Sequence, residues 1–157
     1  MRKAFLAVAA VVSLVTVAAA QRPARTPADL IRNRQTWYKQ ISAAFKGLFE
    51  QSRASAPSIE AIRPHAATIA RLAPQVNGWF PPGTGPETGV PTRAKAELWA
   101  NRRDFLARAA AFVVAARRVD AAARAGDIDA YRAAFPGLRQ ACADCHDRYR
   151  GPEIPQG

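Results

Sequence analysis

The sequence predicts an all-α fold, an antiparallel four-helix bundle. Its 157 residues have the length of one domain. A composition rich in alanine and arginine favours helices. Four stretches repeat apolar residues at steps of three and four, the spacing of one helical face. Because most connections between these stretches are short, neighbouring helices are expected to run antiparallel.

The first two helices are expected at about 26–51 and 58–72. The start of the first is marked by Thr26 as N-cap, a proline in the first turn and Asp29 near the positive helix end. Its apolar face carries one charge, Arg34, and a buried charge needs a partner. The second stretch contains Pro64, which predicts a kink or a late start.

The other two helices are expected at about 102–124 and 127–150. A Pro/Gly-rich connection over 74–91 precedes them, and its Trp79 and Phe80 are expected to pack back on the bundle. Asn101 and Asp104 resemble a capping box at the start of the third helix. In the fourth helix, Pro136-Gly137 predicts a bend or local unwinding. Its seam has heptad spacing and comprises Tyr131, Phe135, Leu138, Cys142, Cys145 and Tyr149.

Residues 1–20 have the pattern of a signal peptide. A positive start is followed by an apolar run over 4–20 that ends in three alanines, so cleavage is expected near Ala20 and the remaining domain is 21–157. The alternative is a retained membrane anchor, but the run is slightly short for a bilayer. Cleavage predicts a periplasmic protein. It removes Met1, the only methionine, and lowers the formal charge from +11 to +9 by removing Arg2 and Lys3.

Cys142-Ala143-Asp144-Cys145-His146 fits the C-x-x-C-H pattern of covalent haem attachment. Thiols three residues apart lie on one side of a helical turn, where each can form a thioether with a haem vinyl group, and the adjacent histidine can bind the iron. A redox dithiol is the first alternative, but such dithiols usually lie at a helix start beside a strand. Here the motif lies late in a helical seam, and no strand is predicted. A zinc site lacks ligands, since His65 is the only other histidine, and a disulfide would close a very small ring. The pattern therefore predicts one haem c with His146 as metal ligand.

Three segments are similar to the class II c-type cytochromes, the cytochrome c-prime family. They are 34–38 (RQTWY), 92–99 (TRAKAELW) and 142–150 (CADCHDRYR). The resemblance covers nearly all of residues 21–157. It implies a bundle whose first, third and fourth helices line the haem, with Tyr38 over the distal face. It also implies a homodimer through the first two helices.

Two arginines are candidate partners of the haem propionates, Arg34 and Arg150. Each has an alternative. The side chain of Arg34 could reach solvent at the edge of the bundle, and a cation at a helix C-terminus, as at Arg150, needs no ligand.

The sixth iron ligand is expected to be absent. Methionine is excluded in the processed chain. The phenol of Tyr38 is a poor ligand unless deprotonated, so we expect it to cover a five-coordinate, high-spin iron. His65 is the rival ligand, although it falls on no clear apolar stripe and a surface position is expected for it.

These observations predict a periplasmic electron-transfer cytochrome. Its large positive charge indicates an anionic partner, which we expect to be a redox protein with an acidic surface and not a nucleic acid. The alternative is a gas-binding protein for nitric oxide or carbon monoxide, and the fold alone does not choose between them. An enzyme is not expected, because the motif has no paired acid and base beside it.

Overall fold

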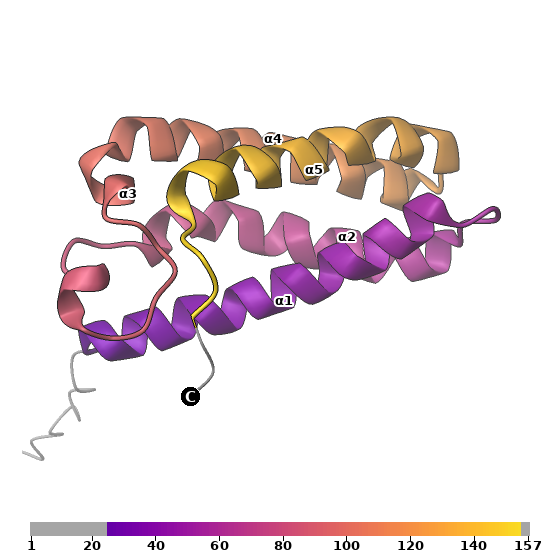
Figure 1. Cartoon of the computed structure of the whole chain (residues 1–157). Helices are drawn as coiled ribbons and strands as arrows, with labels where there is room; N and C mark the ends of the chain where they lie inside the picture. Colours follow the sequence, from indigo (N-terminus) through magenta and orange to yellow (C-terminus); the bar gives the residue numbers. More distant parts are fainter. Residues whose placement is uncertain (1–24, 155–157) are drawn as a thin grey trace, which may run out of the picture.

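The computed structural model describes residues 25–154 and shows four long helices in an antiparallel bundle (Figure 1). They are α1 (Pro27–Arg53), α2 (Ile59–Leu72), α4 (Arg102–Ala125) and α5 (Ile128–Tyr149). In this described part the only β pairing is an isolated bridge between Ala94 and Arg150, so the predicted all-α bundle is confirmed. No helix within these residues is long and apolar enough to span a bilayer. The expected signal peptide lies outside the described residues.

Helix α1 begins at the predicted N-cap, Thr26, which forms a capping box with Asp29. The Thr26 hydroxyl accepts a hydrogen bond from the Asp29 backbone N–H at 3.2 Å, and the Asp29 carboxylate accepts one from the Thr26 N–H at 3.0 Å. This reciprocal pair satisfies two of the N–H groups that a helix start leaves without partners. The helix then buries one continuous face, which includes Ile31, Arg34, Ile41, Ala44 and Leu48.

The two internal prolines do not interrupt their helices. Of the kink or late start expected from Pro64, the late start is excluded, because α2 begins at Ile59. Of the bend or local unwinding expected at Pro136, the unwinding is excluded, because α5 is continuous from Ile128 to Tyr149. Both prolines are exposed, and apolar residues buried before and after them hold each helix against the bundle. Tertiary packing of this kind supplies most of the stability of helices in proteins.

The connection between α2 and α4 contains three short elements that the sequence did not predict. They are the 3₁₀ helices η1 (Ala73–Trp79) and η2 (Pro86–Thr88) and the one-turn helix α3 (Glu97–Ala100). Trp79 and Phe80 are buried here, as predicted. The indole N–H of Trp99 donates to the Pro81 carbonyl at 3.0 Å and ties the connection together.

Helices α1 and α5 contact each other mainly at one end of the bundle. There the Tyr131 hydroxyl donates to the Leu48 carbonyl, and the rings of Phe45 and Phe135 stack at 5.5 Å. Toward the C-terminal end of α5 the two helices diverge (Figure 1). The other neighbouring pairs, α1 with α2, α2 with α4 and α4 with α5, pack more extensively. The end of α5 that carries the cysteines therefore depends on partners other than α1.

The capping box of α1 makes stability depend on pH. Hydrogen bonds from Thr26 lower the pKa of Asp29 from 3.8 to about 2. A carboxyl whose pKa is lowered by folding stabilises the folded state above its unfolded pKa and loses that contribution as pH falls through its folded pKa. We expect Asp29→Asn to reduce stability at pH 6, and the difference from wild type to fade between about pH 4 and pH 2. Guanidinium denaturation across this range measures the difference.

The matched control is Asp129→Asn, in the first turn of α5, whose side chain is 96% exposed. It is expected to change stability less at pH 6. A stability difference for Asp29→Asn that stays constant from pH 7 to pH 2 would contradict the assignment.

Candidate haem-binding site

The two cysteines lie on the last turns of α5 as free thiols. Cys142 and Cys145 are both partly buried, and Cys142 packs against the hydrophobic core. Burial raises the pKa of Cys142 to about 11, so the thiol is protonated at neutral pH. No three potential metal-ligating side chains gather anywhere in residues 25–154. The site therefore offers two thiols for covalent attachment but no ligand set for a zinc ion.

His146 follows the second cysteine and keeps an exposed side chain. Its pKa is lowered, first by the partial desolvation of the ring and then by the positive charges of Arg150 and Arg93. These effects favour the neutral imidazole, which is the form that binds a metal. The local environment of His146 thus suits the role of an axial ligand.

Asp104 on α4 fixes the same end of α5. Its carboxylate accepts hydrogen bonds from the Tyr149 hydroxyl at 2.5 Å and from Arg108 Nε at 2.8 Å, and Arg148 Nε lies 3.3 Å away. Arg108 also donates to the Asp144 carbonyl at 3.2 Å, inside the C-x-x-C-H turn. The hydrogen bonds from Arg108 and Tyr149 lower the pKa of Asp104, so the acceptor remains ionised.

The capping box expected at Asn101 and Asp104 was wrong. Asn101 makes no side-chain cap hydrogen bond, and its amide donates instead to the Glu97 carbonyl at 3.2 Å. The Asp104 carboxylate is occupied instead by Tyr149 and Arg148 of α5 and by Arg108 of its own helix.

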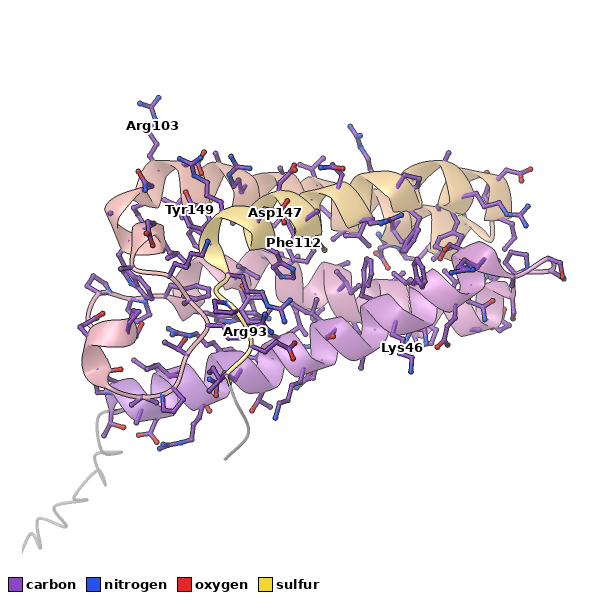
Figure 2. All side chains as sticks on the ribbon, viewed as in Figure 1. Lys46, Arg93, Arg103, Phe112, Asp147 and Tyr149 are labelled. Atoms are coloured by element: carbon purple, nitrogen blue, oxygen red, sulfur yellow. The ribbon has the colours of Figure 1, made fainter. Side chains whose placement is uncertain are left out.

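A backbone pairing holds the other side of the α5 terminus. The Lys95 N–H donates to the Tyr149 carbonyl at 3.0 Å, and the Gly151 N–H donates to the Arg93 carbonyl at 2.7 Å. Arg93 Nε returns a hydrogen bond to the Gly151 carbonyl at 3.0 Å, and Figure 2 shows Arg93 beside the C-terminal segment. Arg150 is the C-cap of α5 and is exposed. Its pairing with a propionate stays a prediction.

Arg34 is buried, with 1% of its surface exposed, so the alternative of a solvent-reaching side chain was wrong. Its Nη2 donates to the Thr84 carbonyl at 2.8 Å and to Thr92 Oγ1 at 2.9 Å, and its Nη1 donates to Thr84 Oγ1 at 3.0 Å. The guanidinium also lies 4.7 Å from the centroid of the Phe80 ring. None of the carboxylates in the described chain forms an ion pair with it. Burial accordingly lowers the pKa of Arg34.

Tyr38 lies one helical turn after Arg34 and is partly buried. Its ring makes an edge contact with Trp79 at 5.2 Å and a tilted contact with Phe80 at 6.2 Å. The pKa of Tyr38 is raised, chiefly by burial and then by the neighbouring thiols, Cys145 before Cys142. The structure therefore brings Tyr38 of α1 and both cysteines of α5 to the same region between the diverging helices.

His65 occupies a different place. Its imidazole packs on Gly47, where an added Cβ would lie 2.2 Å from Nε2. Gly47 follows Tyr38 by nine residues, or about 14 Å along a helix. The structure therefore groups His65 with the α1–α2 contact and not with the cysteines.

The residues brought together fit a covalently bound haem. Two thiols and an imidazole share one turn of α5, an aromatic side chain faces them from α1, and the buried charge of Arg34 has only neutral partners. A buried guanidinium with neutral partners suits the carboxylate of a propionate, because such pairs form strong charge-assisted hydrogen bonds. Thr84 and Thr92 were missed by sequence reasoning, since a threonine in a loop carries no signal for a partner about 50 residues away.

Comparison with known proteins decides the family. The sequence profile of the Cytochrome C′ family matches residues 29–150. The chain belongs to the cytochrome c′ family. A cytochrome c′ of Rubrivivax gelatinosus is 30% identical over 125 residues, which cover 79% of this chain and 95% of that protein. The family is one of haem proteins with a four-helix bundle, as the resemblance of the three segments predicted.

Two solved structures of cytochromes c′ are similar in fold. One, described as having an unusual ligand-controlled dimer dissociation, has a TM-score of 0.74 and 27% identity, and the match covers 82% of this chain and 99% of that chain. The other is a nitric oxide complex of a mutant from Alcaligenes xylosoxidans. It has a TM-score of 0.72 and 28% identity, with 81% of this chain and 98% of that chain covered.

The contact between Tyr149 and Asp104 can be tested by a double-mutant cycle. Tyr149→Phe keeps the aromatic packing on Phe105 but removes the hydroxyl. We expect it to lower the thermal midpoint by a few degrees. In a background of Asp104→Asn the same change is expected to cost much less, because residues in direct contact are energetically coupled. Calorimetry of the four proteins measures the coupling, and strictly additive midpoints would contradict it.

Proposed function

We propose that this chain is a periplasmic electron-transfer protein with a single haem c. Cys142 and Cys145 would hold the haem through thioether bonds, and His146 would bind the iron, which supplies a one-electron redox centre. The observation that carries the proposal is the grouping of these three residues on one fixed turn of α5 opposite Tyr38. Export through cleavage near Ala20 and a role without enzymatic turnover belong to the same proposal.

Positive charge around the motif supports electron transfer to an acidic partner. Arg93 and Arg150 lie close enough to His146 to lower its pKa, and Lys95 Nζ lies 3.5 Å from the Asp147 carbonyl. Figure 2 shows Asp147 on the last turns of α5, near Tyr149. A basic surface beside a redox centre steers an acidic protein toward it and raises the association rate.

Gas binding is the second candidate function, and the position of Tyr38 favours it. With a haem bound at the cysteines, the Tyr38 ring would exclude larger ligands from the iron by its bulk and would move aside for a diatomic molecule. A related cytochrome c′ has been solved as a nitric oxide complex, which supports nitric oxide or carbon monoxide as the ligand. A homodimer through α1 and α2 also remains a proposal, supported by the related structure described by its dimer dissociation.

Covalent attachment is tested by extraction with acid and organic solvent. We expect the haem to stay on the polypeptide and the denatured chain to show the mass of one added haem. Replacement of either cysteine by alanine is expected to leave a single thioether, and replacement of both is expected to release the haem. Free haem in the organic layer, together with an unmodified polypeptide mass, would contradict the proposal.

Tyr38 is tested by the rate at which the ferrous protein binds carbon monoxide. Tyr38→Ala is expected to increase this rate several-fold, because it removes the bulk over the iron, while Tyr38→Phe keeps the bulk and should stay near wild type. The absorption spectrum of the wild-type protein is expected to be that of five-coordinate, high-spin iron. A low-spin spectrum that disappears in His65→Ala would show that His65, and not Tyr38, occupies the distal position.

A further inference from the structure

An arginine-lined groove lies between α2 and α4, apart from the haem motif. It has a volume of about 650 Å³ and is open to solvent. Two arginines come from each wall: Arg63 and Arg71 from α2, and Arg117 and Arg124 from α4. Asp120 is the one acidic residue that lines it.

Two of the four arginines are already fixed in position. Arg63 Nε donates to the Ala123 carbonyl at 3.1 Å, and its Nη1 pairs with Glu60 at 2.8 Å. Arg124 pairs with Asp120 at 2.9 Å. The Asp120 side chain is only 12% exposed, so its charge is largely committed to this pair. The groove therefore holds part of its positive charge on side chains whose orientation is set by the protein.

In the described part of the chain, the charges of Arg71 and Arg117 are not offset by a neighbouring acid. Within the described residues, neither Arg71 nor Arg117 forms an ion pair or a side-chain hydrogen bond, and both are exposed. Alanines at 67, 70 and 121 line the groove between them, and such short side chains leave the space hollow. Glu60 and Asp120 offset the charges of Arg63 and Arg124, so Arg71 and Arg117 supply the positive charge that a bound anion would offset.

We propose that this groove binds a small, soluble ligand that carries more than one phosphate group. Guanidinium groups match phosphate oxygens in geometry as well as charge. Arginines on two facing walls suit an anion that can reach both. A concave groove admits such a ligand more readily than the flat surface of a membrane.

The groove is separate from the haem motif. Arg108, whose side chain reaches the Asp144 carbonyl, precedes Arg117 by nine residues and Arg124 by sixteen, or about 14 and 24 Å along a helix. Arg63 lies beside the turn between α4 and α5, since an added Cβ at Gly126 would lie 3.8 Å from its Nη2. In Figure 1 this turn and the C-terminal end of α5 lie at opposite ends of the bundle.

The test is calorimetric titration of the haem-loaded protein with sodium tripolyphosphate. We expect binding to wild type, at least a fivefold weaker affinity for Arg71→Gln and for Arg117→Gln, and none for the double variant. Arg103→Gln is the control, because it removes the same charge from a side chain that points away from the bundle (Figure 2). Asp120→Asn is expected to strengthen binding, because it releases Arg124, and a loss of folding could not produce that result.

A second arm separates a soluble ligand from a lipid headgroup. Vesicles of phosphatidylcholine with phosphatidic acid are sedimented with each variant. One outcome would overturn the soluble ligand in favour of a lipid. In it, the protein binds vesicles but not tripolyphosphate, and vesicle binding is lost in the double variant and kept in Arg103→Gln. Equal weakening by Arg103→Gln and the groove variants would overturn the site itself, as would the absence of binding in both arms. An unchanged haem absorption spectrum in every variant confirms that the fold is intact.

Discussion

The buried guanidinium of Arg34 is the constraint on which the haem-binding end of the bundle depends. A charge with 1% exposure is tolerated only when hydrogen bonds replace its water. Thr84 and Thr92 supply them, so the long connection between α2 and α4 must fold over α1. The residue after Thr92 is Arg93, which pairs through its backbone with Gly151. The same connection therefore satisfies Arg34 and holds the terminus of α5, and it couples the two walls of the site.

The divergence of α1 and α5 follows from where their side chains meet. At one end, Phe45 and Phe135 stack and Tyr131 binds the Leu48 carbonyl, which brings the helices together. At the other end the seam of α5 carries Cys142 and Cys145, and α1 presents Tyr38, whose ring contacts Trp79 and Phe80. The heptad seam continues through both halves of α5, but its ring stacking and its hydrogen bond to α1 lie in the first half.

The sequence predicted what depends on local spacing. Periodicity located four helices, and the C-x-x-C-H pattern identified the candidate site. The place of Arg34 on an apolar face left two alternatives, burial with a partner or a side chain that reaches solvent, and the structure shows burial. Contacts between distant residues carry no such signal. Asp104 three residues after Asn101 has the spacing of a capping box, and only its tertiary partner Tyr149 determines which way it points. The prolines leave their helices uninterrupted for the same reason, because packing on both sides of each proline holds its helix and propensity alone does not include packing.

Two groups of basic residues occupy separate regions of this chain. One surrounds the haem motif and includes Arg93, Lys95 and Arg150. The other is the groove between α2 and α4. About 14 Å of helix separates Arg108 from Arg117, and about 24 Å separates it from Arg124, while exposed charges at physiological ionic strength are screened over about 8 Å. An exposed charge in the groove is therefore largely screened from the C-x-x-C-H turn. A net charge of +11 cannot reveal this division, because it counts charges without placing them. The fold places these basic residues in two settings, an exposed surface beside the C-x-x-C-H turn and a groove between α2 and α4.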